Sequence, residues 1–229
     1  MSAPARHKKL IPEEALDVLR PTENKKSANL SILPQRDPGI KIASITFSMV
    51  TVYATVRYNV FKGVAWSEWP VYTLNKVFGV TSLVLLVIAV IRYRSGNTLP
   101  NGKIMYSAGL MAGIHILLSC FLLKPSYYPK FFTSDKLTLI AGLSMLLGTI
   151  ASVIFISGAV SKGDRPLRDK VISLVMICVL TGLHTFFQGF QTWLVLSTWP
   201  GFLPPITMLS TLASIVALAC IIIPKRTHN

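Results

Sequence analysis

Five long stretches without a charged residue constrain how this chain can fold. They cover residues 42–56, 77–91, 104–123, 137–161 and 171–224. A helix needs roughly 20 apolar residues to cross a bilayer, with about 17 as a practical lower limit. The third and fourth stretches reach this length alone, and the last can hold two helices separated by Pro200, Gly201, Pro204 and Pro205. The first two stretches reach it if flanking cations extend to the membrane interface; these are Arg57, Lys76 and Arg92.

The composition favours the same class. Hydrophobic residues make up 52% of the chain and charged residues 14%, with a mean hydropathy of +0.55, which is far above that of soluble domains. We therefore predict an all-α integral membrane protein, with a membrane domain over residues 42–223 between tails at 1–41 and 224–229. Its six transmembrane helices are expected near 42–60, 74–93, 104–123, 137–157, 171–196 and 205–223.

The basic residues predict the topology. If the N-terminus is inside, 17 of the 23 Lys and Arg residues fall on the inner side, as the positive-inside rule requires. Both termini are then cytoplasmic, and all four tryptophans lie near the outer side. The net charge of +14 is explained in this way, so no nucleic-acid partner is expected.

The first 41 residues are polar, basic and interrupted by five prolines, which predicts an extended tail. Within it, PEEALDVLR at 12–20 has proline and two glutamates in its first turn, which favours a short helix. This helix either rests transiently on the membrane surface or docks a partner. Because the first apolar segment follows a charged tail, no cleavable signal peptide is expected, which suits a bacterial inner membrane.

Two histidines lie in the predicted third and fifth helices. His115 follows Lys103 by 12 residues and His184 follows Lys170 by 14, which places them roughly 18 and 21 Å from the inner charges. Ionisable residues at membrane depth are candidates for function. Because both helices run outward, the two imidazoles are expected to face each other at nearly equal depth.

Two facing histidines suit one b-type haem held at both axial positions. Thr181, Gln188 and Gln191 share the face of His184 and could bond its second ring nitrogen, the haem carboxylates or buried water. Small residues near the histidines are expected to leave room for a flat macrocycle; they are Gly109, Ala112, Gly113, Gly182 and Gly189. Two alternatives remain open, a hydrogen-bonded packing pair and a proton or ion pathway. The pathway is disfavoured because no Asp or Glu lies in a predicted helix.

The order of these features resembles the ferric reductase-like transmembrane domain, a six-helix haem core. The resemblance is carried by LNKVFGVTSLVLL (74–86), AGIHILLS (112–119), GLSMLLGTIASVIFISG (142–158) and GLHTFFQGFQTW (182–193). It implies that His115 and His184 are the haem ligands. The chain departs from the family in three ways. It lacks the second pair of histidines of two-haem members, and it lacks the flavin and nicotinamide domains. After the second ligand, Thr185 and Phe186 stand where the family has an arginine and an aromatic residue. It is most similar to the single-haem form, as in the membrane subunit of the methionine sulfoxide reductase system.

The resulting hypothesis is a membrane electron-transfer subunit of an oxidoreductase. It binds one haem b, whose iron is the metal ligated by His115 and His184, and Gln188 and Thr181 are further cofactor-binding residues. Electrons would come from a quinol or a separate flavoprotein and pass to an unidentified acceptor. The alternative is a non-redox accessory subunit of a larger membrane complex. Arg57 and Lys76 are expected to extend to the membrane interface, with pairing to haem carboxylates as the second option. No internal repeat of clear period is expected.

Overall fold

The computed structural model describes residues 38–94, 102–160 and 167–223. The predicted helix at 12–20 and the tail at 224–229 lie outside the described residues. Within the described part of the chain, six helices are long and apolar enough to cross a membrane, which confirms the predicted number. They are Pro38–Phe61, Trp66–Tyr93, Gly102–Leu122, Leu139–Gly158, Arg168–Thr192 and Pro200–Ile222.

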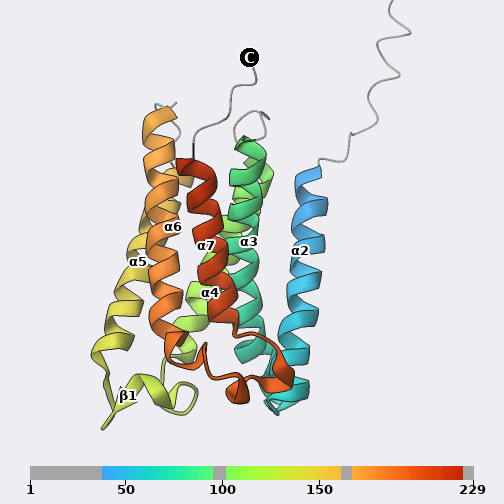
Figure 1. Ribbon diagram of the computed structural model, residues 1–229, viewed down its shortest axis with the longest axis vertical. Coiled ribbons are helices and arrows are strands. Elements are labelled where there is room, and N and C mark those ends of the chain that lie inside the picture. The colour runs from blue at the N-terminus through green and yellow to red at the C-terminus, as the bar shows by residue number, and fades with distance from the viewer. Residues whose placement is uncertain (1–37, 95–101, 161–166, 224–229) are drawn as a thin grey trace, which may run out of the picture. The chain divides into compact units, whose positions relative to one another are not determined.

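Each span is built around one α-helix, and all of them run lengthwise in Figure 1. The helices are α2 (Pro38–Thr55), α3 (Leu74–Arg94), α4 (Gly102–Leu122), α5 (Leu139–Val160), α6 (Leu167–Gly189) and α7 (Ile206–Ile222). α2 begins at a proline, whose fixed φ suits the first helical position and whose missing N–H is not needed there. Because the number of spans is even, the start of α2 and the end of α7 lie at the same end of the bundle.

The opposite end carries short irregular elements, and we call it the hairpin end after its two-stranded hairpin (Figure 1). The hairpin pairs β1 (Phe132–Thr133) with β2 (Lys136–Leu137), and its turn residues Ser134 and Asp135 have positive φ. The remaining elements at this end are η2 (Val56–Phe61), η3 (Trp66–Glu68), η4 (Trp69–Thr73), η5 (Pro129–Phe131), η6 (Phe190–Thr192), η7 (Leu196–Thr198) and η8 (Pro200–Phe202). The topology predicted from the sequence places this end outside.

The second span is longer than the sequence predicted, because residues of the expected loop at 61–72 are helical. η4 is a π-helix that continues directly into α3. The Thr73 hydroxyl donates a 2.9 Å hydrogen bond to the Asn59 amide oxygen, and Asn59 donates to the carbonyl of Val64. These buried bonds fold the connection between α2 and α3 back onto the helices.

The helices pack mainly as neighbouring pairs. α3 packs against α4, α5 against α6, and α7 lies against both α3 and α6. α2 packs against α3 and α4 at the edge of the bundle (Figure 1). Small side chains such as Ala43, Ala89 and Ala108 are buried between helices, which lets the backbones approach closely.

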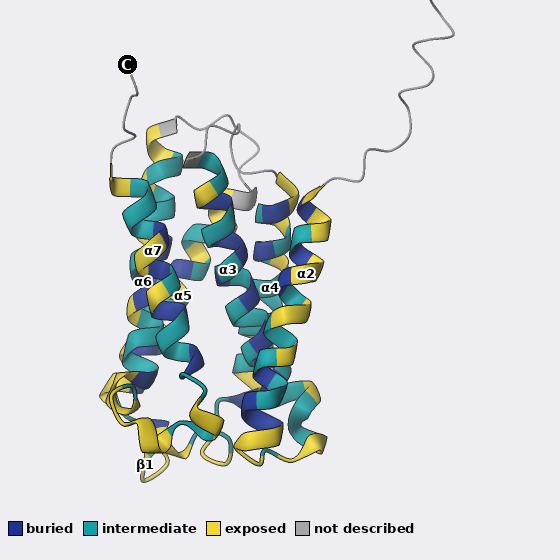
Figure 2. Ribbon diagram, turned by 45° about the vertical axis from the view of Figure 1, so that its right-hand side comes forward, coloured by how far each residue is buried: buried dark blue, intermediate teal, exposed yellow. Residues whose placement is uncertain are grey.

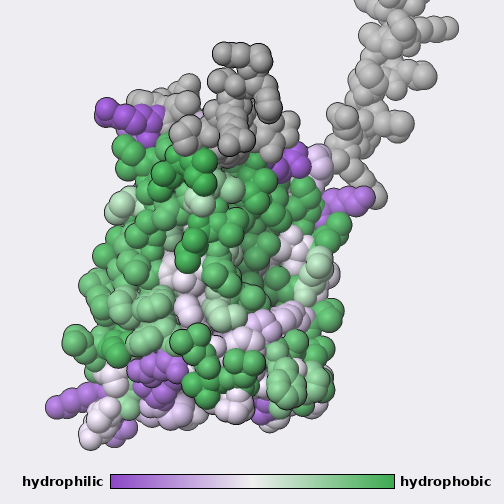
Figure 3. Space-filling view, viewed as in Figure 1, coloured by the Kyte–Doolittle hydropathy of each residue, from purple (hydrophilic) through white to green (hydrophobic). Residues whose placement is uncertain are grey.

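The outward surface of the helices is apolar, and Figure 3 shows this surface between hydrophilic groups near the two ends. Exposed side chains include Met49, Leu117, Phe121, Leu146 and Val153. Figure 2 shows that exposed positions recur along the helices rather than only in the loops. An apolar surface of this kind is suited to lipid, so the chain is an integral membrane protein in contact with the bilayer.

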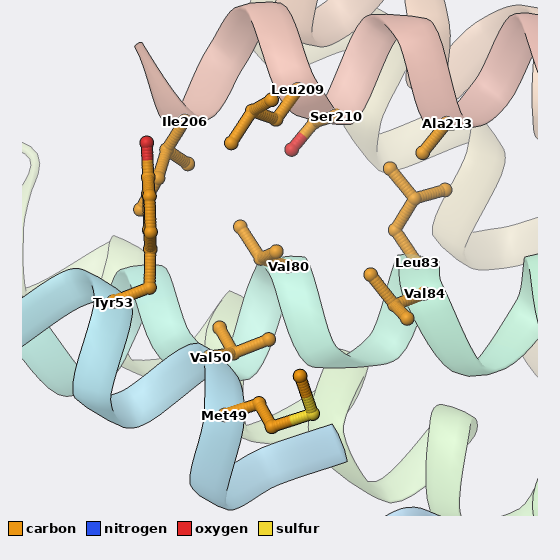
Figure 4. A pocket seen from close by; sticks show the side chains of 10 residues that line it. All are labelled: Met49, Val50, Tyr53, Val80, Leu83, Val84, Ile206, Leu209, Ser210 and Ala213. Carbon is orange, nitrogen blue, oxygen red and sulfur yellow. The ribbon is translucent and has the colours of Figure 1, made fainter. Parts of the chain in front are cut away.

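An apolar cavity of about 210 Å³ lies between α2, α3 and α7 (Figure 4). Its wall is made largely of aliphatic side chains from these helices, including Val50, Val80 and Leu209. Tyr53 and Ser210 add the polar atoms, and the Tyr53 hydroxyl donates to the carbonyl of Pro204.

Candidate functional site

His115 projects from α4 toward α3, where two oxygen atoms of Asn75 meet its Nδ1. The backbone carbonyl oxygen of Asn75 lies 2.9 Å from Nδ1, and the side-chain amide oxygen lies 2.7 Å away. A carbonyl oxygen only accepts, so Nδ1 carries the proton and donates it. In a neutral imidazole this leaves the lone pair on Nε2.

His184 repeats this arrangement between α6 and α5. Its Nδ1 lies 2.7 Å from the backbone carbonyl oxygen of Ser144, and the Ser144 hydroxyl donates a 3.0 Å bond back to the carbonyl of His184. Nδ1 is again the protonated nitrogen, and Nε2 again has the lone pair. The amide nitrogen of Gln188 lies 2.9 Å from Nε2 and donates to it.

A glycine sits against the face of each imidazole. A Cβ atom built at Gly79 would lie 3.0 Å from Nδ1 and Cε1 of His115, and one at Gly148 would lie 2.8 Å from Nδ1 of His184. Real Cβ atoms essentially never come closer than 3.0 Å. Each ring therefore occupies space that a side chain on the partner helix would take.

These contacts reveal a repeat that contradicts the sequence expectation. Each histidine bonds a carbonyl 40 residues earlier in the chain. The glycine against its ring follows that carbonyl residue by four positions in both cases, and another glycine precedes each histidine by two. The α3–α4 and α5–α6 pairs thus share one pattern at an offset of 69 residues. Hydrophobic similarity between helices hides it in the sequence, and the hydrogen bonds show which positions matter.

The two histidines lie at similar distances from the hairpin end. His115 precedes the end of α4 by seven residues and His184 precedes the end of α6 by five, which is roughly 10 and 8 Å along each helix. The two helix pairs therefore place both imidazoles at nearly the same level along the bundle.

The other predicted residues are placed differently. Gln188 contacts Nε2 of His184, and the other ring nitrogen, Nδ1, is held by Ser144. The Thr181 carbonyl accepts the Thr185 hydroxyl, and among the described residues Thr181 makes no hydrogen bond to His184. Gln191 is exposed in η6.

Three glycines expected to leave room for a macrocycle pack against side chains instead, so that expectation is wrong for them. Positions for a Cβ at Gly109, Gly182 and Gly189 lie 2.0 to 3.1 Å from the nearest side-chain atom. The neighbours are Phe155 for the first and α7 residues for the other two. Only Gly113 of the predicted set has open space beside it. The glycines that the histidines need, Gly79 and Gly148, lie on the partner helices.

A second feature, which sequence reasoning missed, is a polar pocket of about 370 Å³ at the hairpin end. We call it the basic pocket, because four cations line it: Arg57, Lys62, Lys76 and Lys130. Gln188 lines it too, so the pocket adjoins the residue that bonds His184. The expectation of an outward-extending side chain is wrong for Arg57, which is buried, whereas Lys76 is half-buried and its interfacial position stays a prediction. Arg57 is only 6% exposed and bonds the carbonyl of Leu203, while Lys76 bonds the Tyr128 hydroxyl at 3.0 Å.

Lys130, like Lys62, is a pocket cation outside the spanning helices. Its ammonium donates a 2.5 Å bond to the carbonyl oxygen of Gln188. Burial against the pocket wall, followed by the charges of Lys76 and Lys62, lowers the pKa of Lys130 from its ordinary value. The tyrosine Tyr72 acts in the opposite direction but does not outweigh them.

No protein-family model matches the chain, and a search of curated proteins finds no match either. The resemblance to the ferric reductase-like domain therefore stays a prediction. Function has to be argued from the histidines, their partners and the basic pocket.

Proposed function

We propose that this chain is a membrane electron-transfer protein that binds one b-type haem through the Nε2 atoms of His115 and His184. The observation that supports it most is the pair of Nδ1–H bonds to backbone carbonyls. Metal-binding histidines usually donate their other ring N–H to a carbonyl or carboxylate, which fixes the tautomer and the ring orientation. Both imidazoles have that second-nitrogen contact.

The donor set also fits a haem better than a free metal ion. Among the described residues, no group of three or more His, Cys, Asp and Glu side chains could hold a metal ion. Two imidazoles are enough only for a metal that brings its other ligands with it, as porphyrin iron does. If haem were held by both imidazoles, it would supply one-electron transfer rather than substrate chemistry.

The protein's own residues have defined tasks in this proposal. The carbonyls of Asn75 and Ser144 keep each Nδ1 protonated, and Gly79 and Gly148 admit the rings. Gln188 must release Nε2 of His184 before a metal can take that lone pair.

The electron donor is a quinol or a separate flavoprotein, and the acceptor is a further protein or small molecule. The apolar cavity between α2, α3 and α7 offers a quinol ring a place among the helices (Figure 4). We propose that both termini are cytoplasmic, as the bias of the basic residues indicates, and that the membrane is a bacterial inner membrane.

One observation favours a second candidate, a non-redox accessory subunit of a larger membrane complex. Both ring nitrogens of His184 have hydrogen-bond partners inside the protein, Ser144 and Gln188. An imidazole satisfied in this way needs no metal.

The absorption spectrum of the purified chain, before and after dithionite reduction, separates the two. We expect the reduced α band of a six-coordinate b haem in the wild type and in His7→Ala, a tail histidine serving as control. His115→Ala and His184→Ala should each lose the band. A colourless wild-type protein from haem-replete cells would leave the accessory subunit as the function.

A further inference from the structure

The positive charges of the basic pocket are not balanced by acidic residues among the described residues that line it. Its cations come from separate segments: Arg57 from η2, Lys62 after it, Lys76 from α3 and Lys130 from η5. None of the described residues lining the pocket is Asp or Glu. Glu68 acts on the pocket only through Tyr127, a lining residue whose pKa it raises.

Tyrosine rings hold the lysines in place without neutralising them. The Lys76 ammonium lies 4.4 Å from the ring centroid of Tyr72 and 4.8 Å from that of Tyr128. The Lys62 ammonium lies 5.6 Å from the centroid of Tyr58. Cation–π contacts of this kind favour a fixed position for an ammonium group but leave its charge available.

Arg57 adds a donor that has no partner. One guanidinium nitrogen bonds the carbonyl of Leu203, whereas Nε is buried without a hydrogen bond among the described residues. A buried unsatisfied donor is costly and calls for an acceptor. Arg57 presents a planar donor group of the kind that suits carboxylate and phosphate oxygens.

The backbone around the pocket is unusual in the same place. Arg57 and Tyr58 lie in the π-helix Val56–Phe61, and Tyr72 lies in the π-helix Trp69–Thr73. π-Helical turns are rare and frequently occur at functional sites. Both of these segments supply pocket-lining residues.

We propose that the basic pocket binds an anion carrying two or more carboxylate or phosphate groups. Four cations from three segments, rings that fix the lysines and a buried arginine donor together favour a multivalent anion over a single charge. Two sources can supply this chemistry, a free small polyanion and the carboxylates of the haem proposed above. The inference itself does not depend on haem, because the wall has the same charges without it.

The test is citrate binding, with inorganic phosphate as a second probe, to the full chain in zwitterionic nanodiscs by isothermal titration calorimetry. Haem-free protein is made in haem-deficient cells. We expect citrate to bind it, and Lys62→Gln to weaken binding about tenfold, the loss of one charge-assisted contact. Lys62 is exposed, so its replacement does not disturb the fold. Lys136→Gln removes an exposed charge at the same end but outside the pocket, and should bind citrate as the wild type does.

Citrate binding to haem-loaded protein shows whether the pocket's anion is a free small molecule or the haem carboxylates. Loss of citrate binding on loading would mean that the haem carboxylates occupy the pocket, and retained binding would mean that a free anion does. No binding of either probe to haem-free protein, or equal effects of Lys62→Gln and Lys136→Gln, would overturn the proposal. A protein that binds citrate but never takes up haem would reject the proposed function and leave the anion site standing.

Discussion

The Nδ1 atom of His184 lies 2.7 Å from the backbone carbonyl oxygen of Ser144, and this bond decides which ring nitrogen has the lone pair that can bind a metal. The carbonyl cannot donate, so the proton is on Nδ1 and the lone pair is on Nε2. His115 is held in the same way by Asn75. Four predictions follow from these contacts and from the hairpin end.

The tautomer is the first prediction. In haem-free protein at neutral pH, both His115 and His184 should be neutral imidazoles protonated on Nδ1. The 15N chemical shifts of histidine-labelled protein in nanodiscs measure this directly, and His115→Gln and His184→Gln assign the two signals. A proton on Nε2 of either ring would contradict the carbonyl contacts.

The second prediction concerns Gly148. An added Cβ would lie 2.8 Å from Nδ1 of His184 and displace the ring from the Ser144 carbonyl. Overpacking of this kind costs about 1–3 kcal/mol, so Gly148→Ala should lower haem affinity about fivefold or more. Titration of haem into haem-free protein measures the change. Gly142→Ala on the same helix is the control, because a Cβ there meets nothing within 4 Å. Equal affinities in the two variants would show that ring position does not matter.

The third prediction concerns the hydrogen bond from Thr73 to Asn59, which folds the connection between α2 and α3. Thr73 is fully buried, and Thr73→Val keeps its shape while leaving the Asn59 oxygen without that donor. The unfolding free energy should fall by about 1–3 kcal/mol. Chemical denaturation in detergent can be compared with Thr149→Val, an exposed threonine that bonds only its own helix. A loss no larger than in this control would show that the bond is unimportant.

The fourth prediction is a pH dependence of citrate binding. The pKa of Lys130 is lowered by burial and by Lys76 and Lys62, so this ammonium loses its proton at a lower pH than an ordinary lysine. Deprotonation removes a positive charge, so affinity should fall as the pH rises through that lowered pKa. Arginine stays protonated throughout, so Lys130→Arg should remove this part of the alkaline loss. Identical pH profiles of wild type and Lys130→Arg would exclude Lys130 as the titrating group.

The sequence predicted the six spans well, because uncharged stretches of spanning length require no knowledge of packing. The second span was too short in the prediction. Its first residues, from Trp66 on, look like an aromatic loop at the membrane interface, and the bond between Thr73 and Asn59 shows that this segment folds back.

The candidate site was predicted in part. His115 and His184 could be selected because an ionisable side chain is rare in an apolar helix. Asn75 and Ser144 could not, because they act through backbone carbonyls that every residue has. The basic pocket was missed because its cations come from three segments that are distant in the chain, and each cation alone is typical of a membrane interface.

The common spacing of the two helix pairs bears on how the chain could have arisen. A pattern repeated at an offset of 69 residues is what tandem duplication of one helical hairpin would leave, with each copy contributing one imidazole and its carbonyl partner. A single ancestral hairpin would have carried half a site and would have needed a second copy beside it. At the position four residues after the histidine the two pairs differ, with Ser119 in one and Gln188 in the other.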